Sequence, residues 1–409
     1  MKLVDRARSA ANRTGLGSGD GRFAVGYFFL FSVYGITTPF LQVLVERLGY
    51  GKAEIGFYLG LFEAAGIGGQ LLLGRVADGS GKYRPWLLLT AGLTAISVFP
   101  LALFPSPLVT FPAIVAMAFG VRGMVPVMDA SVVAHINRSR TGGTGDAETG
   151  GGRRSNYGLI RSMGSIGYIV MLIVAQAAQV ERGSALMISS WTAGAALVFI
   201  AVLSIVPESG GIARRGAGGS PSPSRPFDPR LILGLVVIAL GRLAMAPINS
   251  FFTLYVDEVV KSDMAGLLWA ISAVAEVPAL ILAKRLIERF GPMRVLALST
   301  AAIALRLAIY IFAPTLAGAL AGQLLHFFCY GLFLPSAIAF VSSHVPPERR
   351  VWGMSLLNAA AVGFPSFLGS AAGGLILAKG GYDALFGWAI LPALLGLAIW
   401  AASRKFLDA

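Results

Sequence analysis

The sequence predicts an all-α integral membrane protein with twelve transmembrane helices in two six-helix bundles. The first observation is composition: the 409 residues are 56% hydrophobic and only 13% charged, with a mean hydropathy of +0.73. Soluble domains carry about a quarter charged residues. The second observation is a series of apolar runs of about twenty residues, the length that crosses the hydrocarbon core of a bilayer. The third is a polar segment near the middle of the chain, which separates six runs from six others.

The apolar runs define the expected spans. The first run is too long for the apolar region of a signal peptide and lacks a small-residue cleavage site, so we interpret it as a span. Six runs belong to the first half of the sequence, near 23–45, 54–75, 85–104, 109–135, 156–178 and 184–206. Six belong to the second half, near 229–256, 264–287, 293–314, 316–343, 352–377 and 383–402.

The polar segments between and around the runs give the domain organisation. The middle segment is rich in Gly, Ser and Pro, a composition that does not form a packed core. We therefore expect five parts: an N-terminal tail 1–22, a six-helix bundle 23–206, a linker 207–228, a second six-helix bundle 229–403 and a C-terminal tail 404–409.

The lysines and arginines of the loops predict the orientation, because cytoplasmic loops are enriched in them. If the N-terminus is cytoplasmic, the opposite loops contain few basic residues, namely Arg47, Lys52, Arg182, Lys261 and Lys379. The other loop and tail lysines and arginines then lie on the cytoplasmic side. We therefore expect a multi-pass protein of the inner (cytoplasmic) membrane with both termini in the cytoplasm. This placement explains the net charge of +13 without a nucleic-acid partner.

Two pairs of matching segments indicate that the halves are repeats of one another. The segment Asp78-x-x-Gly81-x-x-Arg84 follows the second run, and Glu288-x-x-Gly291-x-x-Arg294 follows the eighth. Pro126 to His135 in the fourth run matches Pro335 to His344 in the tenth at nearly the same offset. Corresponding positions in corresponding helices are typical of transporters with parallel repeats.

Charged side chains within the runs are the candidate functional residues, since a charge in hydrocarbon is costly and faces a partner or a water-filled path. They are Glu63, Arg122, Asp129, Arg161, Arg242, Glu276 and Arg306, together with the titratable His326. Asp129 and Arg161 flank the Gly-rich loop 141–152 in consecutive helices, so we expect them to pair at similar depth. An ion pair that only joins the two helices explains them too, although three charges in neighbouring helices exceed what one pair needs.

Glycines within the runs suggest close helix packing rather than ligand binding. Small residues let membrane helices approach one another. The glycines concerned are Gly66, Gly68, Gly69, Gly164, Gly167, Gly369 and Gly373.

The motif Gly74-x-x-x-Asp78-x-x-Gly81-x-x-Arg84, within twelve helices in two halves, resembles the major facilitator superfamily. A second set of motifs, spread over nearly the whole chain, carries a resemblance to a narrower group. It includes Tyr34-Gly35, Pro39-Phe40-Leu41, Glu54-Ile55-Gly56, Pro126-x-x-Asp129-Ala130, Tyr157-Gly158-x-Ile160-Arg161-x-x-Gly164, Trp269, Ala275-Glu276-Val277 and Gln323-x-Leu325-His326. This set resembles the phenylpropionate-permease-like branch, which is similar to oligosaccharide and nucleoside proton symporters. Its loop between the fourth and fifth helices is usually shorter than the Gly-rich insertion here.

The resemblance implies the major facilitator fold, alternating access and roles for specific residues. Arg306 is then a structural or outer-interface residue, because its helix does not line the central cavity. Substrate contacts are expected from Arg122, Asp129, Arg161, Arg242, Tyr34, Asn249 and Gln323, with Tyr27 and Asn358 as further hydrogen-bonding residues. Proton coupling is expected from Glu63, Glu276, Asp129 and His326, and gating from Gly74, Asp78, Gly81 and Arg84. For the uncharged polar side chains, a helix–helix hydrogen bond is an equally good explanation.

Three functional classes follow. The first, favoured by the resemblance, is a secondary active transporter for proton-coupled uptake of a sugar, nucleoside or aromatic acid, acting as a monomer in membrane lipid. The second is proton-coupled efflux of drugs or metabolites on the same fold. The third is a non-transporting membrane sensor. An enzyme is disfavoured because no Walker loop, HExxH or GxSxG motif occurs, and we expect neither a cofactor nor a metal site.

Overall fold

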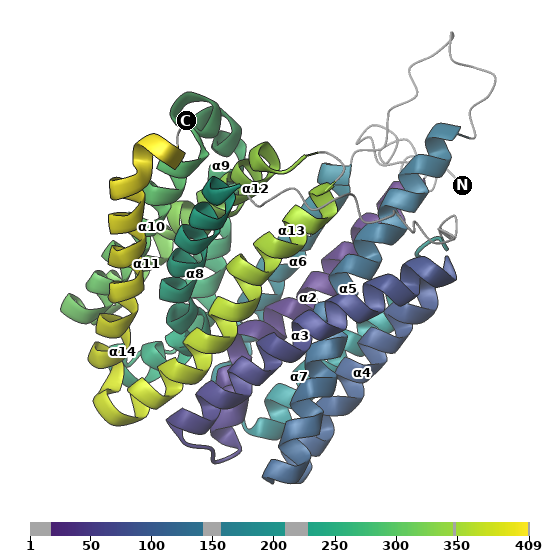
Figure 1. Ribbon diagram of the computed structural model, residues 1–409. Coiled ribbons are helices and arrows are strands. Elements are labelled where there is room, and N and C mark those ends of the chain that lie inside the picture. Colours follow the sequence, from purple (N-terminus) through teal and green to yellow (C-terminus); the bar gives the residue numbers. More distant parts are fainter. Residues whose placement is uncertain (1–17, 142–156, 209–227, 347–348, 408–409) are drawn as a thin grey trace, which may run out of the picture. The chain divides into compact units, whose positions relative to one another are not determined.

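The computed structural model describes residues 18–141, 157–208, 228–346 and 349–407. Within these ranges every regular element is a helix (Figure 1). Most of the predicted tail 1–22, of the Gly-rich loop 141–152 and of the linker 207–228 lies outside the described residues, as does the end of the tail 404–409.

The helices follow the predicted runs closely. In the first half they are α2 (Ser18–Arg47), α3 (Lys52–Ser80), α4 (Arg84–Leu103), α5 (Pro107–Thr141), α6 (Tyr157–Ala177), the short η1 (Val180–Arg182) and α7 (Ala185–Val202). In the second half they are α8 (Pro229–Tyr255), η2 (Val256–Val260), α9 (Ala265–Phe290), α10 (Pro292–Phe312), α11 (Leu316–Leu324), η3 (Phe327–Leu332), α12 (Phe333–His344), α13 (Arg350–Asn358), η5 (Ala359–Gly363) and α14 (Phe364–Leu407). The π-helical segments η3 and η5 join their neighbours into longer helical spans.

Eleven helical stretches in the described ranges are long and apolar enough to cross a membrane. The last, Gly353–Leu407, has 55 residues and would be about 80 Å long as one straight helix. It is broken at Gly381, where φ is 72° and ψ is −171°, and Figure 1 shows the chain reversing direction there. Only glycine adopts such a conformation readily. The two arms match the predicted runs near 352–377 and 383–402, so the described residues contain the twelve expected spans.

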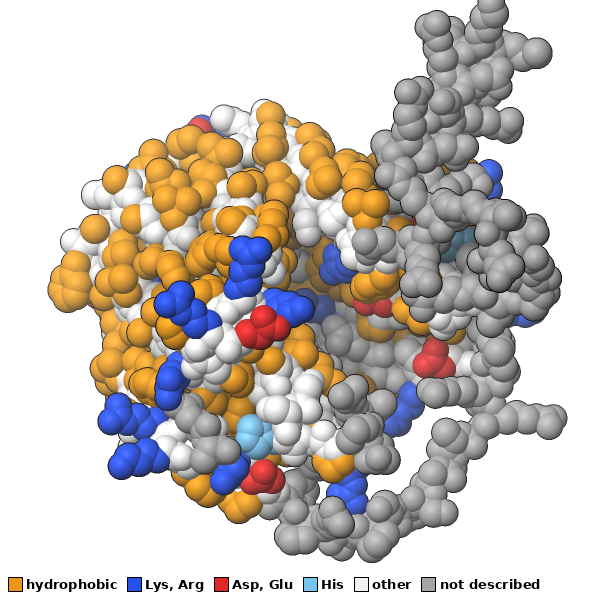
Figure 2. Space-filling view, turned by 90° about the horizontal axis from the view of Figure 1, so that it is seen from above, with side chains coloured by type: hydrophobic (Ala, Val, Ile, Leu, Met, Phe, Trp, Pro, Cys, Tyr) orange, Lys and Arg blue, Asp and Glu red, His pale blue; other side chains and the backbone are white. Residues whose placement is uncertain are grey.

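The outward faces of the helices are apolar. Leu108 is 89% exposed and Phe312 84% exposed, and many other large apolar side chains are similarly uncovered. Figure 2 shows Lys and Arg side chains on the face seen from above, with hydrophobic side chains along its left and upper edges. Exposed apolar surface on this scale is compatible with lipid and not with water. The protein is therefore a multi-pass membrane protein.

The chain divides into two compact units that do not coincide with the two halves of the sequence. Unit 1 comprises Met1–Thr38, Ala65–Met171 and Leu186–Gly219. Unit 2 comprises Pro39–Ala64, Leu172–Ala185 and Ser220–Ala409. The division of the sequence into six helices and six helices stays a prediction.

Glycines bring helices of unit 1 into close contact. A methyl group at Gly167 of α6 would overlap the backbone oxygen of Phe28 in α2. At Gly69 of α3, a methyl group would lie 2.8 Å from the Cα atom of Phe119 in α5. These contacts agree with the packing role that the sequence predicts for these glycines.

In unit 2, the ends of α2 and α3 pack against helices of the second half of the sequence. The hydroxyl of Thr253 in α8 donates a hydrogen bond to the backbone oxygen of Pro39 in α2 (2.7 Å). The same hydroxyl oxygen accepts hydrogen bonds from Gln42 Nε2 (3.2 Å) and Trp269 Nε1 (3.0 Å). Gly56 of α3 approaches the backbone of Ser370 in α14 closely. Unit 2 is thus held together by contacts between residues far apart in the sequence.

Candidate functional site

The predicted gating motif forms the turn between α3 and α4. Helix α3 ends at Ser80, and Gly81 follows in a left-handed conformation (φ 63°). Burial raises the pKa of the Tyr83 hydroxyl in this turn, and the nearby Asp78 carboxylate raises it further. Gly291, in the turn between α9 and α10, also has a positive φ (83°). The matching glycines of the predicted repeat thus both have a positive φ, while the repeat and the gating role of the motif stay predictions.

In unit 1, three helices bring a carboxylate, a guanidinium and aromatic rings together. Tyr27 of α2 donates a hydrogen bond from its hydroxyl to Oδ1 of Asp129 in α5. Nε of Arg161 in α6 lies 4.0 Å from the same oxygen, which is longer than a hydrogen bond. Tyr157, one turn before Arg161, also interacts with the Asp129 carboxylate. The sequence prediction that Asp129 and Arg161 lie side by side is confirmed by this distance.

The guanidinium of Arg161 lies over an aromatic ring. Its central carbon is 4.0 Å from the ring centroid of Phe31 and 5.4 Å from that of Tyr27. Gly164 makes room for this arrangement, because a methyl group there would lie 2.7 Å from Phe31 and 3.0 Å from Arg161. The side chains of Arg161 and Asp129 are 31% and 34% exposed, so both remain accessible to a ligand. We call Tyr27, Phe31, Asp129, Tyr157 and Arg161 the unit 1 cluster.

The other predicted residues of unit 1 lie beside this cluster. Tyr34 stacks on Phe31, with ring centroids 5.3 Å apart, and donates its hydroxyl to the backbone oxygen of Val121 (2.8 Å). Arg122 lies seven residues before Asp129 on α5, hence on the same face two turns away. Its side chain packs against Gly66, where a methyl group would approach Arg122 Cγ to 2.5 Å.

In unit 2, Arg306 is the centre of a buried polar cluster. Arg306 is 0% exposed, so the outer-interface alternative is wrong, and its structural role stays a prediction. Its guanidinium donates to the hydroxyl of Tyr310 (2.9 Å), to Nδ1 of His326 (3.1 Å) and to Oε1 of Gln323 (2.6 Å). Two of these partners, Gln323 and His326, are predicted site residues, and both are buried here.

A second arginine continues this cluster. The His326 ring stacks on Tyr330, with centroids 5.3 Å apart and planes 5° apart. The guanidinium of Arg242 lies 5.2 Å from the centroid of Tyr330, and its Nε donates to the backbone oxygen of Ala361 in η5 (2.7 Å). The predicted residues Arg242, Gln323 and His326 are thus connected through Arg306 and Tyr330.

The remaining predicted residues of unit 2 lie within spans. Glu63 is on α3 and Glu276 on α9, where its side chain approaches Gly331 of η3, and both are partly buried. Asn249 of α8 is partly buried, and Asn358 at the end of α13 is exposed. The predicted substrate residues are therefore divided between the units, with Tyr34, Arg122, Asp129 and Arg161 in unit 1 and Arg242, Asn249 and Gln323 in unit 2.

Phe31 and Glu181 were not among the predicted site residues. Phe31 lies four residues after Tyr27, so helical periodicity places the two rings on one face. That spacing could have identified Phe31 once Tyr27 was considered. Glu181 lies in the loop between α6 and α7, and the sequence carries no signal that its side chain is buried.

Comparison with known proteins agrees with the fold. Residues 22–388 match the model of the MFS_1-like family. A maltose permease of Geobacillus stearothermophilus is 26% identical over 384 residues, which is 92% of each chain. An uncharacterized transporter, YwbF, of Bacillus subtilis is 29% identical over 151 residues, which is 37% of each chain.

Solved structures with the same fold are also transporters. A variant of the nucleoside transporter NupG superimposes with a TM-score of 0.79 at 18% identity and covers 93% of this chain and 99% of its own. A bacterial homologue of the human lysosomal transporter Spinster has a TM-score of 0.70 at 14% identity, with 95% of this chain and 97% of its own covered. These relatives are transporters, not enzymes. The chain belongs to the MFS_1-like family and is a transporter of the major facilitator superfamily.

Proposed function

We propose that the protein takes up a sugar or a nucleoside across the cytoplasmic membrane by alternating access, coupled to the movement of protons. The observation that carries this proposal is the unit 1 cluster, in which Asp129 and Arg161 lie side by side next to the ring of Phe31.

The chemistry of the unit 1 cluster suits a polyhydroxylated ring. A carboxylate accepts hydrogen bonds from neighbouring hydroxyl groups, and a guanidinium donates two in parallel. An aromatic face packs against the apolar face of a sugar ring or against a base. Arg161 Nε and Asp129 Oδ1 are 4.0 Å apart, which is close enough for their charges to attract but too far for a direct hydrogen bond. A hydroxyl group of a ligand can therefore hydrogen-bond to both.

Similarity to named transporters supports the same substrate class. One relative over 92% of the chain is named a maltose permease, and NupG, which shares the fold, is named a nucleoside transporter. Both names denote carriers of ligands with sugar rings. An aromatic acid, which the sequence also suggested, has a carboxylate that Arg161 could bind. It has no hydroxyl groups that could donate hydrogen bonds to Asp129.

Proton coupling is proposed from the carboxylates within the spans. Glu63 and Glu276 are partly buried in helices that cross the membrane, and carboxyl groups within spans are typical members of proton relays. Uptake is preferred to efflux because permeases of the resembling branch work in that direction.

The test is a ligand screen on the purified full-length protein by thermal shift. A ligand that binds the native state raises the unfolding temperature, and a concentration of about one hundred times Kd adds roughly 2.7 kcal/mol of stability. Maltose, another disaccharide, uridine and phenylpropionate are compared for the wild type and for Arg161→Gln. We expect a shift with a sugar or with uridine that Arg161→Gln loses. A shift with phenylpropionate alone, or one that Arg161→Gln keeps, would contradict the proposal.

A further inference from the structure

One end of unit 2 joins loops from both halves of the sequence, and we call it the gate end. It is formed by the segments 48–51, 178–184 and 261–264. Lys52 bridges Glu46 (2.7 Å) in the first half and Glu258 in the second half. Arg182 pairs with Asp263 across 3.0 Å. The loop charges predict that this end faces the outside of the cell.

At the gate end, the last turn of a helix of the first half caps a helix of the second half. Helix α9 begins after Met264, whose side chain makes no capping hydrogen bond. The first N–H groups of a helix need external acceptors. Gln176 Oε1 accepts a hydrogen bond from the amide of Leu267 (3.1 Å), and the Gln176 amide group donates to the backbone oxygen of Asp263. The end of α6 therefore supplies the cap that the sequence of α9 lacks.

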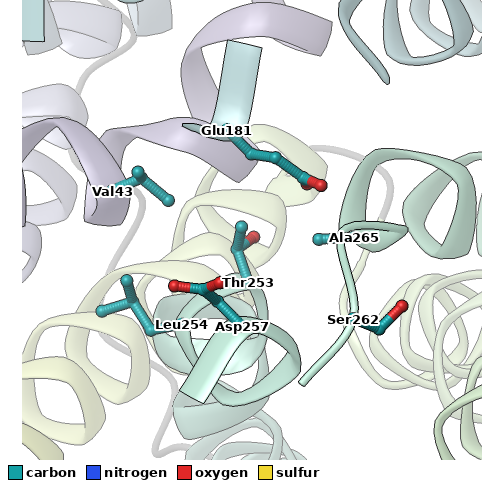
Figure 3. Close-up of a pocket in the computed structure, with 7 residues that line it drawn as sticks. All are labelled: Val43, Glu181, Thr253, Leu254, Asp257, Ser262 and Ala265. Atoms are coloured by element: carbon teal, nitrogen blue, oxygen red, sulfur yellow. The ribbon is translucent and has the colours of Figure 1, made fainter. Parts of the chain in front are cut away.

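Glu181 of η1 is buried beside this cap. It is 9% exposed, and its Oε2 has no hydrogen-bond partner among the described residues. Its Oε1 lies 3.4 Å from Gln176 Nε2. Glu181 lines a small pocket with Asp257, Thr253, Ser262 and apolar neighbours, and Figure 3 shows its carboxyl group extending over the pocket toward Ala265.

The charges around Glu181 disfavour its ionised form. Burial, together with the nearby carboxylates of Asp263 and Asp257, raises the pKa of the Glu181 carboxyl to about 7. Hydrogen bonding to Gln176 and to the backbone of Gly266 opposes the shift without cancelling it. Arg182, the next residue in η1, is paired with Asp263.

We propose that Glu181 is a proton-binding site of the gate, which takes up a proton when the gate end closes and releases it when the gate end opens. The buried, unpartnered Oε2 is the atom that carries the proton. A protonated carboxyl group no longer brings an uncompensated charge into the pocket, so protonation stabilises the closed arrangement. The proposal concerns the gate alone and stands whether or not protons drive accumulation of substrate.

The direction of the pH effect follows from linkage. In the closed state the pKa of Glu181 is raised to about 7, and opening would expose the carboxyl group to water and return its pKa to the ordinary value of about 4.3. The closed state therefore binds the proton more tightly. Between these two pKa values the ratio of closed to open protein falls as pH rises, and it is constant above and below them.

The experiment measures the opening of the gate end in the substrate-free, full-length protein in lipid nanodiscs. Spin labels are attached to Ser184→Cys and Lys379→Cys, two exposed positions in different halves of the sequence. The native Cys329 is buried and can be kept. Pulsed dipolar spectroscopy follows the label distances from about pH 5 to about pH 9. We expect the closed-to-open ratio to fall about tenfold or more as pH rises through this range.

Two variants identify the group that titrates. Glu181→Gln mimics the protonated side chain and should stay closed with no pH response. Glu54→Gln removes an exposed carboxyl group at the same end, which accepts a hydrogen bond from Gly51, and should keep the wild-type response. A wild-type pH midpoint in Glu181→Gln, or loss of the response in Glu54→Gln, overturns the proposal.

A further variant covers the case in which Glu181→Gln does not fold. Asp257→Asn removes a charge that raises the proton affinity of Glu181, so the midpoint of the response should move to lower pH. An unmoved midpoint in Asp257→Asn overturns the proposal. Because no substrate is present, failure to find a sugar or nucleoside ligand has no effect on this result.

Discussion

The guanidinium of Arg306 donates a hydrogen bond to Nδ1 of His326 across 3.1 Å, inside a part of unit 2 where Arg306 is fully buried. Arginine has no acceptor and stays charged, so Nδ1 of His326 must provide its lone pair and the ring is neutral in this arrangement. Among the residues predicted to couple protons, His326 therefore has one ring nitrogen already engaged by a fixed cation, which disfavours its protonation.

The first prediction follows from this hydrogen bond. His326→Asn keeps an acceptor for Arg306 and should retain proton-driven accumulation with an unchanged pH profile. His326→Ala leaves a buried guanidinium N–H without an acceptor and should lower stability by about 1–3 kcal/mol. Transport in proteoliposomes and thermal unfolding measure the two effects. If well-folded His326→Asn loses accumulation but keeps exchange, then His326 is itself a proton carrier.

The second prediction separates a binding role of Asp129 and Arg161 from a structural one. Either single neutralisation, Asp129→Asn or Arg161→Gln, should damage the protein because a partly buried charge loses its partner. The double variant should recover folding, since no unpaired charge remains, while ligand binding falls at least about tenfold. Calorimetry with the ligand found in the screen gives the affinity. Near wild-type affinity in the double variant would mean that the pair only joins α5 to α6.

The third prediction concerns proton coupling by Glu276. Glu276→Gln should keep substrate exchange and lose uphill accumulation, because the side chain can no longer release a proton. Glu54→Gln is the control, because it removes an exposed carboxyl group at the start of another membrane helix, α3. It should transport like the wild type. Undiminished accumulation in Glu276→Gln would leave Glu63, Asp129 and His326 as the remaining candidates.

The fourth prediction compares two glycines in membrane helices of unit 1. In Gly167→Ala the new methyl group overlaps the backbone oxygen of Phe28, so α2 and α6 must separate, and we expect a loss of about 1–3 kcal/mol. Gly194 of α7 has no atom within 4 Å of the position of a methyl group. Gly194→Ala should be neutral or stabilising by up to about 1 kcal/mol. Thermal unfolding in detergent compares them, and equal melting temperatures would refute the packing role.

The fifth prediction concerns orientation. With both termini in the cytoplasm, reporter proteins fused after Arg182 and within the linker 207–228 should lie on opposite sides of the membrane. A phosphatase reporter active only outside and a fluorescent reporter active only inside give complementary signals. Fusions that report the same side would contradict both the orientation and the outer position of Glu181.

The fold could be predicted almost entirely, because a span in lipid requires a long apolar run and the runs are visible along the chain. The bend at Gly381 lies between the apolar runs 352–377 and 383–402, which are already separate in the sequence. The neighbourhood of Asp129 and Arg161 was also predictable, since consecutive helices joined by a loop are adjacent in space.

The rest depends on contacts between residues that are far apart in the sequence. Phe31 under Arg161, and Gln323 and His326 around Arg306, are brought together by helix rotation, which a run of apolar residues does not specify. The position of a charge within a membrane span marks Arg306 as unusual in the sequence. The sequence does not show that three neutral side chains accept hydrogen bonds from its guanidinium. Glu181 carried no signal, because its burial results from a loop packing against a distant helix.

The hydrogen bonds of Thr253 with Pro39 and Gln42 bear on how the polypeptide can be divided. Unit 2 is stabilised by contacts between residues that precede the linker and residues that follow it. Its stability therefore depends on these contacts and not on an unbroken chain through 209–227. Two separately synthesised fragments, ending and beginning within that segment, should therefore find each other in the membrane and reconstitute a working carrier. Neither fragment alone contains a complete unit 2, so each should be cleared by proteolysis when its complement is missing.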